Sequence, residues 1–373
     1  MQRVLLVATV QSHICQFHKP LVELLHENNC EVHVAARNNL AEKNGLKLDF
    51  AEQVFDVPFQ RSPFSLRNLE AYRQLKQIIC EGNYDVIHCN TPVGGVLGRL
   101  AARQARKNGT KVFYTAHGFH FYKGAPLKNW LIWYPVEKFM SHFCDTLITI
   151  TKEDEQLAKK KFTCHVAHIH GVGVEPKRYH VASKEEYAVR RREENILEDA
   201  FVILCVGELN ANKNQDKLIS AANMLKKEIP NLRILLAGNG AREAEYRKQI
   251  EEQGLEHQIK LLGYRTDLEH ITPVVDLVVS CSRREGLPLN ILEAMLCKKP
   301  IVASHNRGHN ELVQDGITGF LVEADDVPAY AERILMLYND PNLAATMGEK
   351  SYEKAQDYTT TRIKEELKQI YGF

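Results

Sequence analysis

Two glutamates eight residues apart are the strongest candidates for chemistry in this 373-residue chain. Glu285 lies in a turn after the apolar segment Leu277–Cys281, and Glu293 lies about two turns into the helix expected after Pro288. Each carboxylate could accept hydrogen bonds from a pair of hydroxyl groups. A helix capped by Glu285, with a solvated Glu293, fits the same spacing. Spacing alone therefore leaves both interpretations open.

The residues around these glutamates suit an anionic ligand. Gly286 permits a close backbone approach. The free N–H groups of the helix start, near Leu289 and Asn290, would face an anion such as a diphosphate. Lys213 is expected at another helix start, where a positive charge is unfavourable, which suggests an anionic partner there. The alternative is an ordinary surface lysine.

Histidines follow two of the expected strands in the first half of the chain. His117 comes directly after Lys111–Thr115, and His13 lies in the first strand-to-helix turn. Each could be a half-buried structural histidine or a ligand-contacting group. We expect no metal site at the nearby set His165, His168 and His170, because alternation along a strand divides it between two faces.

Short β-branched apolar runs alternate with helical segments, which predicts an α/β fold with two doubly wound parallel sheets. The expected strands are Val4–Ala8, Glu31–Ala35, Asp85–Cys89, Lys111–Thr115, Thr146–Ile150, Val166–Ile169, Phe201–Val206, Arg233–Ala237, Ile259–Leu262, Leu277–Cys281, Ile301–Ser304 and Gly319–Val322. The expected helices of the first half are Phe17–Glu27, Leu66–Glu81, Val93–Lys107, Asn129–Ser141 and Lys152–Lys161. A Gly- and Pro-containing break at Gly171–Ala182 predicts two domains, 1–172 and 173–355, and a closing helix within 356–373. Two such sheets facing each other would offer a cleft, with ligands at the carboxyl ends of the strands.

Composition excludes several classes of protein. The 48 Lys and Arg residues nearly balance 47 Asp and Glu, so we expect no nucleic-acid partner. No apolar run approaches the ~18 residues of a spanning helix, and the N-terminus lacks the pattern of a signal peptide. The nine cysteines include no C-x-x-C pair, which favours free thiols in a reducing, cytoplasmic compartment.

One region is more basic than the rest. Residues 61–165 contain 16 Lys and Arg against 8 Asp and Glu, a net charge of +8. Both tryptophans, Trp130 and Trp133, lie within Pro126–Phe143 together with further aromatic residues and lysines. This combination suits peripheral contact with an anionic membrane. A core helix with a solvated basic face fits equally well, and Pro135 interrupts any long amphipathic helix.

The segment from Ser282 to Met295 resembles the E-x7-E motif of retaining glycosyltransferases of family 4, which have the GT-B fold of two Rossmann-like domains. Further segments resemble the family's motifs in the same order. They are Tyr114–Phe121, Ile169–Pro176, Val206–Asn214, Leu236–Gly240, Gly263–Leu268, Asn306–Val313 and Asp315–Phe320. The resemblance therefore covers most of the chain and implies that fold.

The resemblance also implies roles for single residues. Glu285 would contact the donor sugar, Glu293 the nucleotide ribose, Lys213 the diphosphate and His117 the transferring sugar; His117, Glu285 and Lys213 are the candidate catalytic residues. The implied nucleotide-sugar site comprises Gly207, Asn212, Lys213, Gly238, Tyr264, Arg265, Leu268, Glu285, Gly286, Leu287, Leu289, Asn290 and Glu293. The acceptor-side candidates are His13, Trp130 and Trp133. Glu208 stands where the family has an arginine, and Asn214 where it has a glycine. Arg307, Arg283 or helix N–H groups are candidates for the second diphosphate charge.

The implied activity is retaining transfer of a sugar in capsule or exopolysaccharide synthesis. The expected donor is a nucleotide-sugar, with a UDP-sugar favoured. The expected acceptor is a polyprenyl-diphosphate-linked saccharide at the cytoplasmic membrane face. No metal or other cofactor is expected, since the chain has no D-x-D motif. Two alternatives remain open: another GT-B enzyme such as a nucleotide-sugar 2-epimerase, or a non-catalytic nucleotide-sugar-binding subunit, which Glu208 makes conceivable.

Overall fold

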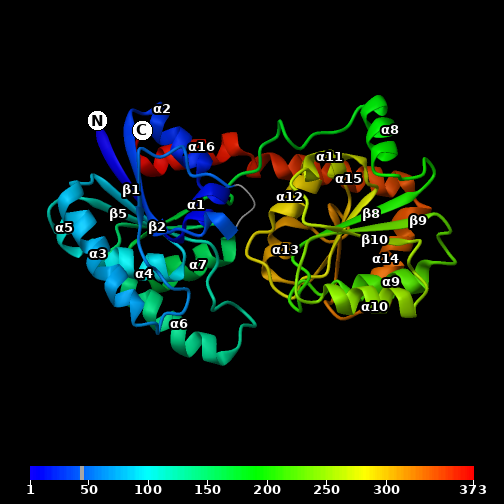
Figure 1. The fold of residues 1–373 in the computed structure, drawn as a ribbon, viewed down its shortest axis with the longest axis horizontal. Helices are drawn as coiled ribbons and strands as arrows, with labels where there is room; N and C mark the ends of the chain where they lie inside the picture. Colours follow the sequence, from blue (N-terminus) through cyan, green and yellow to red (C-terminus); the bar gives the residue numbers. More distant parts are fainter. Residues whose placement is uncertain (43–45) are drawn as a thin grey trace. The chain divides into compact units, whose positions relative to one another are not determined.

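The computed structural model describes residues 1–42 and 46–373, which form two compact units (Figure 1). Unit 1 comprises Met1–Gly173 together with Thr360–Phe373, and unit 2 comprises Val174–Thr359. Each unit has its own parallel sheet and its own apolar core.

The sheet of unit 1 has seven strands in the order β3-β2-β1-β4-β5-β6-β7, and every neighbouring pair is parallel. The strands are β1 (Gln2–Val10), β2 (Cys30–Arg37), β3 (Gln53–Asp56), β4 (Val86–Asn90), β5 (Lys111–Ala116), β6 (Thr146–Thr149) and β7 (His165–His168). The sequence pattern predicts all of them except β3. That edge strand is short and largely exposed, so it carries no apolar run.

Helices connect these strands. They are α1 (Gln11–Phe17), α2 (Lys19–Glu27), α3 (Arg67–Gly82), α4 (Pro92–Ala101), α5 (Arg103–Lys107), α6 (Leu127–Met140), α7 (Lys152–Lys161) and α16 (Thr360–Tyr371). The helix expected over Val93–Lys107 is interrupted at Ala102. The helix expected over Phe17–Glu27 corresponds to α2, which begins at Lys19. The segment before it, expected to be a strand-to-helix turn, instead forms the short helix α1, which contains His13. His18 therefore lies at a junction between helices.

The C-terminal helix α16 belongs to unit 1. It buries Ile363, Leu367 and Tyr371, and the Tyr371 hydroxyl hydrogen-bonds His88 Nδ1 on β4 at 2.7 Å. Lys364 forms ion pairs with two glutamates of α2 at 2.8 and 3.1 Å. The last helix thus packs onto the N-terminal unit, a long-range pairing that its own sequence does not reveal.

Unit 2 has six parallel strands in the order β10-β9-β8-β11-β12-β13. They are β8 (Phe201–Val206), β9 (Leu232–Ala237), β10 (Ile259–Gly263), β11 (Leu277–Ser280), β12 (Ile301–Ser304) and β13 (Gly319–Val322). The helices are α8 (Lys184–Glu193), α9 (Asp216–Leu225), α10 (Glu243–Glu252), α11 (Leu268–Ile271), α12 (Leu289–Leu296), α13 (Arg307–Leu312), α14 (Val327–Asn339) and α15 (Pro341–Ala355). In the described residues of both units, the short 3-10 segments are Leu40–Glu42, Ser141–Phe143, Thr272–Val274 and Gln356–Tyr358. The two parallel sheets confirm the predicted fold class.

Each sheet reverses its strand order once. The reversal lies between β1 and β4 in unit 1 and between β8 and β11 in unit 2. In open α/β sheets, the loops that diverge from the carboxyl ends of two such strands leave a crevice for ligands. In unit 2 these loops contain Lys213 and Glu285.

Candidate active site

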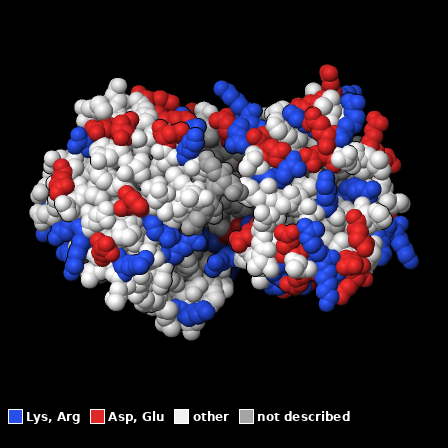
Figure 2. Space-filling model, in the orientation of Figure 1, with Lys and Arg blue, Asp and Glu red and all other residues white. Residues whose placement is uncertain are grey.

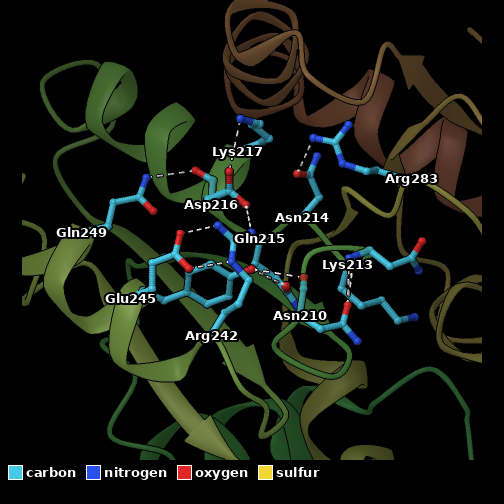
Figure 3. Close-up of polar contacts among 12 residues, drawn as sticks. Asn210, Lys213, Asn214, Gln215, Asp216, Lys217, Arg242, Glu245, Gln249 and Arg283 are labelled. Atoms are coloured by element: carbon cyan, nitrogen blue, oxygen red, sulfur yellow. Dashed lines mark hydrogen bonds and ion pairs between the residues drawn. The ribbon is translucent and has the colours of Figure 1, made fainter.

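The loop after β8 is built around one asparagine. The Asn210 Oδ1 atom accepts hydrogen bonds from the backbone N–H groups of Asn212 and Lys213, at 3.0 and 2.9 Å. This local turn sets the direction of the Lys213 side chain (Figure 3). Asn210 was not among the predicted site residues, although short Asn-rich turns often use such side-chain bonds.

Lys213 and Glu285 are in contact, as expected for loops that follow the neighbouring strands β8 and β11. The Lys213 Nζ atom lies 2.6 Å from Glu285 Oε1, and both side chains are largely buried. Asn212 Nδ2 also donates to the Arg284 carbonyl oxygen at 3.0 Å, and the Arg283 N–H donates to the Asn212 carbonyl oxygen at 2.7 Å. The loops after β8 and β11 therefore form one assembly, with an ammonium and a carboxylate side by side.

Two glycines allow other segments to approach this assembly closely. A Cβ atom on Gly308 would lie 2.5 Å from the Gly286 carbonyl oxygen and 2.8 Å from Glu285 Cβ, so only glycine lets α13 pack here. A Cβ atom on Gly238 would collide with the carbonyl oxygen of Gly207. Gly238, a predicted site residue, and Gly308, which was not predicted, thus let the segments after β9 and β12 approach the loops that contain Lys213 and Glu285.

The second glutamate has a different environment. Glu293 lies in α12, which Asn290 anchors to β8 by donating from Nδ2 to the Val206 carbonyl oxygen at 3.2 Å. Burial raises the pKa of Glu293 to about 7, although a hydrogen bond from Tyr179 and the charge of Arg178 oppose the shift. A buried carboxyl of this kind, beside a tyrosine hydroxyl, can exchange its present partners for the hydroxyls of a ligand.

The loop after β10 is braced by ion pairs. Arg265 contacts Glu194 at 2.6 Å and Asp267 at 2.7 Å, so its guanidinium holds the loop in place and is not free for a ligand. Tyr264 is 56% exposed, and the half-buried Leu268 begins α11. Of the predicted residues in this loop, Tyr264 presents the most surface. Leu287 and Leu289 instead pack partly against the core beside α12.

One histidine near the pair was not predicted. His309 of α13 is fully buried, and its Nδ1 contacts the Ser304 carbonyl oxygen at 2.7 Å. Burial lowers the pKa of His309 to about 4, so its ring is neutral near Glu285. Arg283, a candidate for the second diphosphate charge, instead pairs with Asp325 at 2.6 Å. It also contacts Asn214 at 3.2 Å (Figure 3).

The neighbouring start of α9 is stabilised independently of the Lys213–Glu285 pair. Figure 3 shows Arg242 beside Asp216, with a separation of 3.1 Å, and also bonded to Glu245. Gln249 Nε2 donates to the Asp216 carbonyl oxygen at 3.1 Å. Lys217, one turn beyond Lys213, pairs with Asp216 at 3.2 Å. These charges neutralise one another, which leaves Lys213 as the predicted cation in contact with Glu285.

Histidines gather at the carboxyl edge of the unit 1 sheet. The Nε2 atoms of His13 and His117 lie 3.2 Å apart, and Asn90 Oδ1 lies 3.4 Å from the same nitrogen of His117. Burial lowers the pKa of His117 to about 4 and that of His13 well below its ordinary value. Both rings are therefore neutral near pH 7. His18 joins this cluster, a contact that depends on the helix junction and was not predicted.

The tryptophans of α6 do not form its exposed face. Trp130 donates from Nε1 to the Tyr122 carbonyl oxygen at 3.2 Å, and Trp133 stacks on His120 with ring centroids 5.0 Å apart. Both are half-buried against the core. The exposed apolar side chains of α6 are Leu127, Leu131, Ile132, Val136 and Phe139. The surface in the region of α6 is largely uncharged, with basic side chains on it (Figure 2). Within residues 1–42 and 46–373, no helix combines the length and apolar character needed to cross a membrane.

Several known proteins are similar to this chain in sequence or in fold. Residues 187–354 match the family of glycosyl transferases group 1, and residues 3–151 match the glycosyl transferase 4-like family. A putative glycosyltransferase, EpsD of Bacillus subtilis (strain 168), is 44% identical over all of this chain and 96% of its own. The UDP-Gal:alpha-D-GlcNAc-diphosphoundecaprenol alpha-1,3-galactosyltransferase of Escherichia coli is 27% identical over 79% of this chain and 76% of its own. The crystal structure of Anabaena Alr3699/HepE in complex with UDP superposes with a TM-score of 0.81, at 24% identity, over 100% of both chains. That last likeness concerns the fold alone.

Proposed function

Because the chain belongs to the family 4 glycosyltransferases with the GT-B fold, we propose that it transfers a sugar from a UDP-sugar to a lipid-linked saccharide with retention at the anomeric carbon. The observation that carries the proposal is the 2.6 Å Lys213–Glu285 pair at the switch point of unit 2. One member suits a diphosphate and the other suits sugar hydroxyls. The 44% identity to EpsD supports a place in exopolysaccharide or capsule synthesis.

In this proposal, the enzyme accelerates transfer by stabilising the leaving diphosphate. The Lys213 ammonium faces the negative charge that develops on the departing diphosphate, where a preorganised cation is most effective. Arg307 adjoins Gly308, which touches Glu285, and we assign it the second diphosphate charge in place of the arginine replaced by Glu208. The acceptor hydroxyl attacks the anomeric carbon as the bond to the diphosphate breaks. A departing phosphate oxygen takes the hydroxyl proton, so no covalent nucleophile and no metal are required.

The remaining site residues bind and orient the donor. Glu285 accepts hydrogen bonds from the sugar, and Glu293 accepts them from the ribose. A neutral imidazole donates one hydrogen bond and accepts another, which suits His117 to a sugar hydroxyl. We place His13 on the acceptor side. The relative that acts on a diphosphoundecaprenol-linked sugar supports a polyprenyl-diphosphate acceptor for this chain.

The function is tested directly with purified protein. Thermal shifts with UDP-, GDP- and ADP-sugars identify the donor, because a ligand that binds the native state raises its stability. That donor is then incubated with a polyprenyl-diphosphate-linked monosaccharide, and NMR defines the anomeric configuration of the product. We expect a UDP-sugar to react with retention, at a rate that EDTA leaves unchanged. Inverted product, or release of an epimerised nucleotide-sugar without glycosylated lipid, would contradict the proposal. Loss of activity in EDTA, restored by a divalent ion, would contradict metal independence.

Peripheral membrane contact through α6 is the second part of the proposal. Exposed Leu131 and Phe139 would insert, while Lys123, Lys128 and Lys138 face anionic lipid at roughly 1 kcal/mol each. Co-sedimentation with phosphatidylglycerol vesicles should be strong at low salt and partial at high salt, because salt screens only the charges.

Two sets of variants separate the electrostatic and the apolar contributions to vesicle binding. Changing the three lysines to Glu should weaken binding at low salt, whereas Leu131→Gln with Phe139→Gln should remove the salt-resistant part. Changing Lys159, Lys160 and Lys161 of α7 to Glu alters the net charge equally and serves as the control. Equal loss in the control would mean that general charge, not α6, drives the binding.

A further inference from the structure

Three histidines of unit 1 bring their ring nitrogens together. His13 lies in α1, His18 at the junction of α1 and α2, and His117 directly after β5. One ring nitrogen of each residue lies within 4.8 Å of the other two. The ring centroids are 4.6 Å apart for His13 and His117, 5.2 Å for His13 and His18, and 5.5 Å for His18 and His117. Two segments distant in sequence, the first helical segment and the residue after β5, thus converge on one point.

Hydrogen bonding accounts for only part of this cluster, the contact between His13 and His117. His18 is 4% exposed, and its Nε2 atom has no hydrogen-bond partner among the residues that the structure describes. A small cavity of about 20 Å³ lies against His18 and His117, enough for a water-sized occupant. A buried nitrogen without a partner costs free energy, and it persists more readily where a ligand can occupy it.

The spacing suits a tetrahedral metal ion. Zn–N bonds of about 2.0–2.1 Å place neighbouring tetrahedral nitrogens about 3.3 Å apart. The Nε2 atoms of His13 and His117 are already 3.2 Å apart, so the third ring, that of His18, has to move closer. Imidazole ligands favour zinc and its neighbours over magnesium or calcium.

We propose that His13, His18 and His117 bind one Zn²⁺ ion through one ring nitrogen each, with the fourth position open to solvent. In the described part of the chain, no other group of three His, Cys, Asp or Glu side chains meets the geometric requirement for a metal. His165, His168 and His170 do not form such a group.

Binding of Zn²⁺ at this site would inhibit sugar transfer, and this step rests on the proposed function. The ion would take the His117 nitrogen proposed to contact the transferring sugar, and it would hold His13 at the same time. Zn²⁺ and transfer therefore compete for the same imidazoles. Zn²⁺ should slow sugar transfer, and a chelator should restore it.

Cobalt provides a readout that requires no substrate. The full-length chain, free of any histidine tag, is titrated with Co²⁺ and Zn²⁺ by visible absorption and calorimetry. We expect one equivalent to bind, with the intense visible bands of four-coordinate cobalt and no thiolate charge-transfer band. Loss of an outer-shell partner alone lowers metal affinity 10–100-fold. His18→Gln, which removes a direct ligand, should therefore lower it more than about 100-fold.

Matched variants make the test decisive. If His18→Gln fails to fold, His13→Gln takes its place in the test and should show the same loss of metal affinity. His142→Gln changes an exposed histidine of the same unit and should lose no affinity. Zn²⁺ should inhibit the wild-type chain at concentrations that leave transfer by His18→Gln unaffected. A weak six-coordinate spectrum, a thiolate band, or equal loss in His142→Gln would overturn the site. The predicted spectrum without inhibition of an active enzyme would overturn the regulatory role. Because the cobalt titration requires no substrate, it tests the metal site whether or not the proposed donor and acceptor are correct.

Discussion

Replacing Lys213 by alanine should lower the rate of sugar transfer by about 10²–10³-fold, the usual effect of removing one preorganised group that stabilises transition-state charge. The side chain is held in place by the Asn210 turn and by Glu285 at 2.6 Å. Arg283, another predicted cation, pairs with Asp325 and is therefore held away from this position. The variant removes a charge that Arg283 does not replace.

The binding pattern should identify the group that Lys213 contacts. Lys213→Ala should bind UDP more weakly than the wild-type chain, while its affinity for uridine stays unchanged. Lys213→Arg retains the positive charge and should recover part of the activity. Lys217→Ala is the matched control, because Lys217 lies one turn further along and pairs with Asp216. Equal weakening of UDP and uridine binding would show that Lys213 does not contact phosphate. Thermal unfolding of each variant separates this effect from the loss of the Glu285 ion pair.

Local patterns in the sequence predict most of the fold, because buried parallel strands read as continuous apolar runs. All six strands of unit 2 appear where these runs lie. In unit 1 the pattern fails at β3, whose edge position leaves it exposed and polar. It also misses α1, where a turn is expected, because seven residues are too few to establish a helical period.

The sequence predicts those site residues that come directly after strands, because the carboxyl ends of parallel strands lie at one edge of the sheet. Lys213 and Glu285 come after β8 and β11, and the strand order of the sheet brings them together. The environment of Glu293 is not predictable in this way. Tyr179 comes from a segment expected to be only a hinge, and its approach to α12 depends on the packing of unit 2. The tryptophans illustrate the same limit, since composition does not tell which face of α6 is exposed.

Replacing Glu293 by glutamine should weaken UDP binding by about 10- to 150-fold, since loss of a charged hydrogen-bond acceptor costs about 1.5–3 kcal/mol. Glutamine keeps the size of the side chain and can still bond Tyr179, so the fold of α12 should be preserved. Glu256→Gln, an exposed glutamate of the same unit, is the control and should bind UDP normally. Calorimetry with UDP measures both variants.

The pH dependence provides an independent test of the same residue. Burial raises the pKa of Glu293 from 4.5 to about 7, so between these values the native state holds a proton that the unfolded chain has lost. The resulting stabilisation is fully present below pH 4.5 and is lost as the pH rises through about 7. Glutamine does not titrate, so the Tm of Glu293→Gln relative to the wild-type chain should increase over this range.

The affinity for a nucleoside should increase with pH, whereas the stabilisation described above decreases. The reason is that the ionised carboxylate is the better acceptor for ribose hydroxyls. Wild-type affinity for uridine should rise as the pH increases through about 7, and Glu293→Gln should show no such step. Uridine is the appropriate ligand because it carries no phosphate that titrates in the same range. A pH-independent uridine affinity in the wild-type chain, together with equal UDP affinity in the variant, would remove Glu293 from the ribose site. A relative Tm that still rises with pH would then leave it as a buried carboxyl with a purely structural role.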